Sequence, residues 1–543
     1  MKRLITFFES HPVISVILIG LSIFLINLGS FPLTIMEARN FITAREMIHD
    51  NNWLLTSMNG IPRYEKPPLP TWLSAISALM LGQAGLFAWR LPAALMVIFL
   101  GIVIYYFSLK LRLSKTQSLQ NALIAISSFY IISITIEAPW DIFAHGFMTA
   151  GIYFLFRFFQ SEKNIWKNAL LASFFTGLSL LSKGPVSLYA LLLPFFIAYF
   201  TVYKWENQKK KWLAFLGYIF LAVVIGGWWW IYVYLNDTTS TSIFSKETKN
   251  WSSYHTKPFY YYWSFFIQSG IWTIPAFMSL IYPYMKKRVK YKKAYKFTFL
   301  WTIIAVILLS LIPEKKTRYL MPVLIPLSLN TGFYIEYLIH NFKKIKNKFE
   351  LIPPYLNTIL LIIISFIGPL VIFIKFHPFQ NKFGLLFLVV LVTFYTIGYI
   401  LWHSLRAKDF KTIFYSMVFL SGLYFILIIP IRNRLGKQND AKQIQAISLF
   451  EKQNHIKTYS IGIVAPEFLW YYNGKIEDLS SENKQTIPQE SKFGIIIAKR
   501  EKISVTKFFG NNYEVKKIGE YNLNTGKKQR LRLIHEYYMV KQK

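Results

Sequence analysis

Five short segments, far apart in the sequence, combine acidic and basic residues in a pattern that suits phosphate chemistry. They are Glu37-Ala38-Arg39, Arg63-Tyr64-Glu65-Lys66, Asp141, Lys183 and Arg318. A carboxylate accepts a proton from an attacking hydroxyl, and Lys and Arg bind a phosphate and stabilise the charge that develops as it leaves. Brought together, these side chains would form a site that grips a phosphate and deprotonates a nucleophile.

The alternative for each residue is a structural role at a membrane surface. Lys and Arg extend to lipid headgroups, and Tyr and Trp form interfacial belts. This explanation is weakest for the acids Glu37, Glu65 and Asp141, which gain nothing from an anionic leaflet. The acids therefore carry most of the functional signal.

The composition indicates that the elements positioning these residues lie in a membrane. The 543 residues are 54% hydrophobic, 18% aromatic and 16% charged. A bilayer core about 30 Å thick needs roughly 20 apolar residues per helical crossing, and such stretches recur from Pro12 to Pro430. The first, Pro12 to Pro32, is too long for a signal-peptide core, so we expect a retained helix.

The apolar stretches predict a polytopic α-helical membrane protein with about thirteen transmembrane helices. We treat Pro67 to Gly82 as an interfacial helix, because it is short and begins with prolines. The expected crossings are Pro12 to Pro32, Phe87 to Leu109, Ser118 to Ile136, Ile142 to Phe159, Asn168 to Leu181, Val186 to Tyr203, Leu213 to Leu235, Tyr260 to Met285, Phe297 to Leu311, Tyr319 to Ile339, Leu356 to Ile374, Phe383 to Trp402 and Ile413 to Ile429.

With this threading and the N-terminus inside, the main basic clusters fall on the cytoplasmic side, as the positive-inside rule requires. The net charge of +35 is divided among short clusters between apolar segments. That distribution argues for membrane topology and against nucleic acid as a partner. The chain has no cysteine, which excludes disulfides, thiolate metal sites and a cysteine nucleophile.

The odd number of crossings places the polar C-terminal segment outside. We therefore predict a transmembrane domain over residues 1–431 and an extracytoplasmic domain over residues 432–543. Short apolar runs at Tyr459 to Val464 and Phe493 to Ala498, with helical patterns near Ala441 to Gln453 and Lys502 to Phe509, predict a small α/β fold for the second domain.

The order and spacing of the outer-loop motifs resemble the polyprenyl-phosphate-dependent glycosyltransferases of the GT-C fold. Within this superfamily the chain is similar to the transferases that attach aminoarabinose (4-amino-4-deoxy-L-arabinose) to lipid A, and more distantly to protein mannosyltransferases. The resemblance covers about the first 330 residues. It rests on Glu37-Ala38-Arg39, Ala44-Arg45-Glu46-Met47, Asn59-Gly60, Tyr64-Glu65-Lys66-Pro67-Pro68, Arg90-Leu91-Pro92, Asp141, Ser182-Lys183-Gly184-Pro185, His255 to Tyr262, and Arg318-Tyr319 with Pro322.

The resemblance implies an inverting transfer, in which an acceptor oxygen attacks the anomeric carbon and a polyprenyl phosphate leaves. It implies a sugar donor linked to polyprenyl phosphate, a lipid or glycan acceptor such as lipid A, and a site on the periplasmic face of a bacterial inner membrane. The sugar is expected to be aminoarabinose-like or a hexose.

Relatives carry an Asp-Glu pair in the first outer loop, where this chain has Met36-Glu37. Glu37 takes the role of general base, or Asp141 carries it, or an ionised phosphate acceptor needs little help from a base. We prefer Glu37 as the base, with Asp141 orienting the acceptor or the sugar.

The resemblance also implies roles for the other outer-loop residues. The residues expected to bind the lipid phosphate are Lys66, Arg318, Arg63 and Lys183. The residues expected to contact the substrates are Arg39, Tyr64, Tyr261 and Tyr319. Glu65 and His255 match positions that can hold a divalent metal; no other cofactor is expected.

Three other functions compete with this one. A protein O-glycosyltransferase or a surface-polymer glycosyltransferase would share the fold and differ in its acceptor. A lipid-linked sugar flippase would show paired repeats and polar residues at the bilayer midplane, and the sequence shows neither. A noncatalytic relative would explain the missing first-loop Asp.

Overall fold

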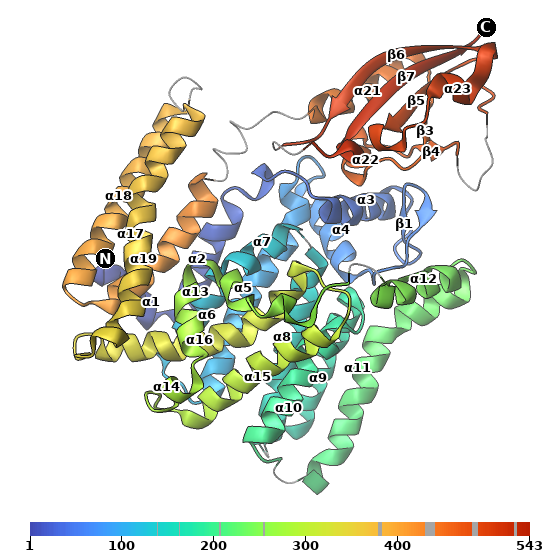
Figure 1. Ribbon diagram of the computed structural model, residues 1–543. Coiled ribbons are helices and arrows are strands. Elements are labelled where there is room, and N and C mark those ends of the chain that lie inside the picture. The colour runs from blue at the N-terminus through green and yellow to red at the C-terminus, as the bar shows by residue number, and fades with distance from the viewer. Residues whose placement is uncertain are drawn as a thin grey trace.

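The computed structural model describes residues 1–137, 139–161, 163–205, 208–253, 256–377, 383–428, 440–480, 487–525 and 529–543. A bundle of long apolar helices makes up most of the chain, and a small mixed domain at the C-terminus lies against one end of the bundle (Figure 1). This arrangement agrees with the predicted polytopic membrane protein carrying a small α/β domain. The predicted boundary at residues 431 and 432 lies outside the described residues.

Eight helical segments in the described part of the chain are long and apolar enough to cross a membrane, and a ninth arises if one bent pair forms a single span. The bent pair, α6 (Lys115–Ser127) and α7 (Phe129–Glu137), turns by 52°. The other spans contain α2 (Pro12–Leu25) with η1 (Leu28–Ser30), α5 (Phe87–Lys110), α8 (Pro139–Gln160), α11 (Gln208–Asn236), α15 (Lys292–Leu311), α17 (Lys348–Phe376), α18 (Gly384–Arg406), and α19 (Phe410–Leu423) with η6 (Tyr424–Ile428).

The predicted number of thirteen spans is not confirmed. Each remaining predicted span coincides with helical structure, but these segments are too short, too interrupted or too polar to qualify by length and composition alone. They are α9 (Ile165–Lys183), η2 (Leu188–Leu192) with α10 (Leu193–Val202), the chain of η3 (Phe259–Tyr262), η4 (Phe265–Trp272), α13 (Thr273–Ser279) and α14 (Tyr282–Lys286), and η5 (Thr317–Leu320) with α16 (Met321–Asn341).

Two ion pairs join segments of the predicted cytoplasmic side, at the end of the bundle away from the C-terminal domain (Figure 1). Arg288 pairs with Glu350 at 2.7 Å, and Lys411 pairs with Glu9 of α1 (Lys2–Ser10) at 2.7 Å. These contacts join loops that the sequence predicts to share one side of the membrane, so the fold is consistent with the threading.

The first outer loop lies at the opposite end, beneath the C-terminal domain (Figure 1). It contains α3 (Ile35–His49), the hairpin β1 (Ser57–Met58) and β2 (Ile61–Pro62), and α4 (Leu69–Leu81). The 13 residues of α4 span about 20 Å, which is too short to cross a bilayer. This helix fits the predicted interfacial segment, with Ala75 and Ala78 buried on one face and Leu79 and Met80 exposed on the other.

The C-terminal domain is built on a five-stranded sheet in the order β4-β3-β5-β7-β6. Strand β3 pairs in parallel with β4 and β5, while β7 pairs antiparallel with β5 and β6. The elements are α21 (Ala441–Asn454), β3 (Thr458–Ile461), α22 (Pro466–Tyr472), β4 (Glu477–Asp478), β5 (Lys492–Ala498), η8 (Lys499–Glu501), α23 (Val505–Phe509), η9 (Gly510–Asn512), β6 (Tyr513–Asn522), η10 (Leu531–Leu533) and β7 (Ile534–Gln542). This confirms the predicted α/β fold.

The first outer loop and the C-terminal domain lie at the same end of the bundle, so both should be accessible from the same side of the membrane. Single cysteines at the exposed positions Asn51 and Asn512 should react with a membrane-impermeant thiol reagent in intact spheroplasts. A cysteine at the exposed Lys210 should react only after lysis. The native chain has no cysteine, so the background is clean. Labelling of the Lys210 position in unbroken cells would refute the threading.

Candidate functional site

Glu37 is buried in an ion pair with Arg90. Its side chain is 1% exposed, and the Arg90 Nε and Nη2 donate to its two carboxylate oxygens at 2.6 and 3.0 Å. The backbone N–H and hydroxyl of Thr34 donate to Glu37 Oε2 at 3.1 and 3.2 Å, which completes a capping box at the start of α3. Burial raises the pKa of Glu37, and the contacts with Arg90 and Thr34 oppose that rise. Both oxygens are therefore already used in holding the fold.

Asp141 occupies a different environment, at the facing ends of two neighbouring helices. It lies in the first turn of α8, and its Oδ1 accepts a bond from Lys183 at the end of α9. His145, one turn further along α8, has its Nε2 3.9 Å from the same oxygen, and its Nδ1 is 2.9 Å from the Ser187 hydroxyl. Among the described residues, Oδ2 of Asp141 has no hydrogen-bond donor. Lys183 thus holds one oxygen of this carboxylate, while the other oxygen makes no hydrogen bond within the described part of the chain.

Additional cations surround the Asp141–Lys183 pair. Arg318 interacts electrostatically with both residues, and Lys66 interacts with Lys183. The Lys183 ammonium and the Arg318 guanidinium each lie 5.7 Å from the centre of the Tyr319 ring. Lys183, Arg318 and Lys66 thus lie close to one another beside Asp141, an arrangement that suits the binding of a phosphate.

A second group of side chains surrounds Arg63 in the first outer loop. Its Nη1 donates to the Arg39 carbonyl at 2.9 Å and to the Thr43 hydroxyl at 3.1 Å, which ties the loop to α3. Its guanidinium lies 5.3 Å from the centre of the Trp140 ring, next to Asp141 in sequence, and its Nε is 3.6 Å from Glu65 Oε2. Trp140 Nε1 and Arg39 Nε are buried and have no hydrogen-bond partner among the described residues. Trp140 and Arg39 both contact Arg63, which is one of the predicted phosphate ligands.

The tyrosines predicted to contact substrates are held by polar partners. Tyr64 donates to Asp237 Oδ2 at 2.5 Å. Burial and this partner raise the pKa of Tyr64, and the bond from Tyr64 lowers the pKa of Asp237. Tyr319 donates to Glu314 at 3.3 Å, and the Tyr261 hydroxyl lies 3.2 Å from that of Thr317. Tyr261 and Tyr319 therefore border the cationic cluster, while Tyr64 is directed toward the end of α11.

The loop around Glu314 is fixed by its own contacts. Lys316 Nζ pairs with Glu314 at 2.5 Å, and Tyr262 accepts from the Lys316 backbone N–H at 2.9 Å while donating to its carbonyl at 3.0 Å. Lys315 donates to the Lys257 carbonyl at 3.1 Å. These bonds order the segment that presents Arg318.

The structure brings together most of the predicted site, and it pairs Glu37 with Arg90. Asp141, Lys183, Lys66, Arg318 and Tyr319 form one electrostatic cluster. Arg63, Arg39 and Glu65 lie beside it, whereas Glu37 is enclosed with Arg90. The prediction that Glu37 is the base remains untested by a measurement, and the geometry argues against it.

Several participants were missed by sequence reasoning. His145 is a lone histidine within an apolar helix, four residues after Asp141, and that i, i+4 spacing was the available signal. Arg90 appeared only as part of a motif. Asp237 had no signal, because its partner Tyr64 is 173 residues away.

The predicted divalent metal also stays a prediction. Glu65 offers one buried carboxylate oxygen without a hydrogen-bond partner, but His255 lies outside the described residues. Among the residues that are described, no group of three or more His, Asp and Glu side chains is placed to hold a metal ion.

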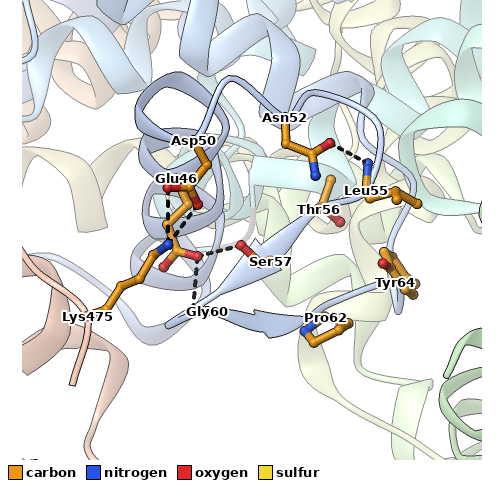
Figure 2. A pocket seen from close by; sticks show the side chains of 10 residues that line it. All are labelled: Glu46, Asp50, Asn52, Leu55, Thr56, Ser57, Gly60, Pro62, Tyr64 and Lys475. Atoms are coloured by element: carbon orange, nitrogen blue, oxygen red, sulfur yellow. Dashed lines mark hydrogen bonds and ion pairs between the residues drawn. The ribbon is translucent and has the colours of Figure 1, made fainter. Parts of the chain in front are cut away.

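A polar cavity of about 310 Å³ lies between the first outer loop and the C-terminal domain. Figure 2 shows Glu46, Asp50 and Lys475 on one side of it and Tyr64 and Pro62 on the other. Glu46 already accepts bonds from Ser57 and from the backbone of Asn59 and Gly60, and Asp50 is paired with Lys475. Because these charged groups already have hydrogen-bond or ion-pair partners, the cavity is a seam between the two domains.

Comparisons with known proteins find named glycosyltransferases among the similar chains. The family described as "Dolichyl-phosphate-mannose-protein mannosyltransferase" matches residues 65–230. An uncharacterized protein of Aquifex aeolicus (strain VF5) is 23% identical over 453 residues, covering 82% of this chain and 83% of that protein. The undecaprenyl phosphate-alpha-4-amino-4-deoxy-L-arabinose arabinosyl transferase of Wigglesworthia glossinidia brevipalpis is 25% identical, covering 64% of this chain and 61% of its own length.

The crystal structure of ArnT from Cupriavidus metallidurans, bound to undecaprenyl phosphate, matches with a TM-score of 0.72 at 14% identity and covers 97% of both chains. The chain is therefore a multi-pass membrane protein with the GT-C fold. With the family match and the named relatives, it belongs to the GT-C superfamily of glycosyltransferases.

The closed Glu37–Arg90 pair predicts a loss of stability when one partner is removed. Breaking a buried ion pair costs about 3 to 5 kcal/mol, so Glu37→Gln should lower the thermal unfolding midpoint in detergent by several degrees or more. The control is Glu477→Gln, which removes an exposed partner of Lys457 and should cost at most about 1 kcal/mol. Equal midpoints for Glu37→Gln and the parent protein would contradict a structural role.

Proposed function

We propose that this protein transfers a sugar from a polyprenyl phosphate donor to an acceptor at the periplasmic face of a bacterial inner membrane, with inversion at the anomeric carbon. The sugar is aminoarabinose-like or a hexose, and the acceptor is lipid A. The observation that carries the proposal is the buried Asp141 carboxylate with Lys183, Arg318 and Lys66 around it. The relatives named as aminoarabinosyl transferases support the choice of donor and acceptor.

The cations stabilise the negative charge of the leaving group. As the bond between the anomeric carbon and the phosphate oxygen breaks, negative charge grows on the phosphate. Fixed cations in a site with little water stabilise that charge without having to reorganise. Lys66 and Arg318 come from two different loops and converge on Lys183, so together they can hold the phosphate from more than one side.

The Oδ2 oxygen of Asp141 accepts the proton of the nucleophile. The acceptor hydroxyl gives its proton to Asp141 as its oxygen bonds to the anomeric carbon, and the polyprenyl phosphate leaves. Lys183 holds the carboxylate in place through Oδ1, and His145 Nε2 lies 3.9 Å from the same oxygen. We assign the base to Asp141 in preference to Glu37, because both Glu37 oxygens are engaged by Arg90 and Thr34.

A mass spectrum tests the overall proposal. Lipid A from cells that express the gene should carry an added aminopentose or hexose, and lipid A from a deletion strain should lack it. An unchanged lipid A together with a lost modification on protein or surface polymer would move the acceptor to one of those classes. No change in any glycan would refute the transferase.

Replacing the phosphate ligands should weaken transfer without unfolding the protein. Charge-assisted hydrogen bonds are worth about 1.5 to 3 kcal/mol, so Lys66→Ala or Arg318→Ala should reduce transfer roughly ten- to hundredfold. The initial rate with a polyprenyl phosphate sugar donor measures this. Lys457→Ala, which removes an exposed lysine of the C-terminal domain, is the control. Parental rates in both site variants would show that the phosphate binds elsewhere.

Removing the proposed base should affect turnover more than donor binding. General-base help is typically worth about 10² to 10⁴ in rate, so Asp141→Asn should lower turnover by that order and leave the donor dissociation constant nearly unchanged. Glu37→Gln protein that remains folded should retain most of its turnover. The opposite result, with Glu37→Gln inactive and Asp141→Asn active, would return the base to Glu37.

A further inference from the structure

We propose that the C-terminal domain positions the donor-binding loop of the membrane domain, with Arg45 of α3 as the positioning residue through which it acts. The inference rests on the proposed function, because the loop in question presents Arg63 and Lys66 to the lipid phosphate. It gives the C-terminal domain a role in donor recognition although none of its own residues reaches the cluster around Asp141 in the described structure.

Arg45 is bound almost entirely by the C-terminal domain. Its side chain points out of α3 into the end of α22, where its Nη1 donates to the Trp470 carbonyl at 3.0 Å and to Asn473 Oδ1 at 2.9 Å, and its Nη2 donates to the Leu469 carbonyl at 3.2 Å. The guanidinium also lies 5.4 Å from the centre of the Trp470 ring. The residue is 7% exposed, so these bonds are shielded from water. Burial lowers the pKa of Arg45 to about 10.

Arg45 caps the end of α22, where carbonyl groups lack partners within the helix. Asn473 adopts the left-handed conformation at the helix end, with φ of 60°. That turn directs the chain back toward α3 and places the Asn473 side chain beside Arg45. The contact therefore depends on the local geometry of the C-terminal domain.

Apolar packing also holds α3 and α22 together. Ile42 of α3 is 1% exposed and belongs to the hydrophobic core of the C-terminal domain, with Phe468 and Tyr472. The Trp470 ring lies 5.7 Å from Phe41 and 5.3 Å from Trp89. Helix α3 thus contributes to the core of both domains.

The segment after α22 also holds the hairpin of the first outer loop. The Asn59 side chain donates to the Ile476 carbonyl at 2.6 Å and accepts from the Ile476 N–H at 2.7 Å. Lys475 pairs with Asp50 at 2.8 Å (Figure 2). The β1–β2 turn is therefore clamped between α3, through Glu46, and the C-terminal domain.

The hairpin and α3 in turn hold Arg63. The Arg63 N–H donates to the Thr56 carbonyl at 2.8 Å, and its guanidinium donates to Arg39 and Thr43 of α3. Lys66 follows three residues later. A continuous series of contacts runs from α22 through Arg45 and α3 to Arg63, so loosening the first contact frees the last.

The test compares Arg45→Ala with Arg532→Ala in the full-length protein. Arg532 also makes two short bonds to a residue of α22, Glu467, but within the C-terminal domain. Arg45→Ala should weaken binding of undecaprenyl phosphate, supplied without a sugar, by about tenfold or more. Arg532→Ala should leave that affinity within about twofold. Equal affinities for Arg45→Ala and the parent would overturn the proposal.

A measurement without substrate separates this inference from the proposed function. Hydrogen exchange of the amides in residues 57–66 should be about tenfold faster in Arg45→Ala than in the parent, because the loop loses its clamp, and unchanged in Arg532→Ala. If exchange is faster in Arg45→Ala but the parent protein itself binds no undecaprenyl phosphate, the proposed function is refuted while the coupling between the C-terminal domain and the loop is supported. Unchanged exchange would refute the coupling.

A reversible cross-link distinguishes positioning from general stability. Asp50→Cys and Lys475→Cys, added to Arg45→Ala, supply two thiols across the seam in an otherwise cysteine-free chain. A short bis-methanethiosulfonate linker should restore the affinity for undecaprenyl phosphate to within about twofold of the parent, and a reductant should remove the gain. Affinity that stays low after complete cross-linking would show that Arg45 does not act through the clamp.

Discussion

A carboxylate buried at the surface of a membrane needs a cation, and two such pairs organise this protein. Burying an unpaired charge costs several kcal/mol, so each buried acid determines which cation must fold against it. Glu37 pairs with Arg90 of α5, and this pair fixes the start of α3. Asp141 pairs with Lys183, and this pair joins the start of α8 to the end of α9. The first outer loop and the cationic cluster are both built around these pairs.

The two pairs differ in what remains after pairing. Arg90 and Thr34 use both oxygens of Glu37, so this pair closes on itself and has no capacity left for a substrate. Asp141 has one oxygen that makes no hydrogen bond among the described residues, and its charge is balanced against Lys183, with Arg318 and Lys66 close to this pair. An anionic ligand with a hydroxyl partner beside it would complete that balance. The same residue type therefore supports the fold at one position and suits chemistry at the other.

The sequence predicted the parts of this structure that follow from composition and local pattern. Apolar stretches located the helices, the prolines and length of α4 marked it as interfacial, and short apolar runs predicted the strands β3 and β5. The role of Glu37 could not be predicted, because its partner Arg90 is 53 residues away and Arg90 resembles any interfacial arginine. The number of transmembrane spans could not be determined from the sequence either, because several helices are short or bent.

The domain boundary illustrates a further limit of sequence analysis. Composition divides the chain near residue 431, where apolar segments give way to polar ones. Packing divides it differently, because Ile42 of α3 lies in the core of the C-terminal domain while Glu37, five residues earlier, is paired with the membrane bundle. One helix of 15 residues thus carries the packing of both domains. A segment that must pack into two cores can adopt few positions, and this constraint can hold Arg63 and the neighbouring Lys66 in place.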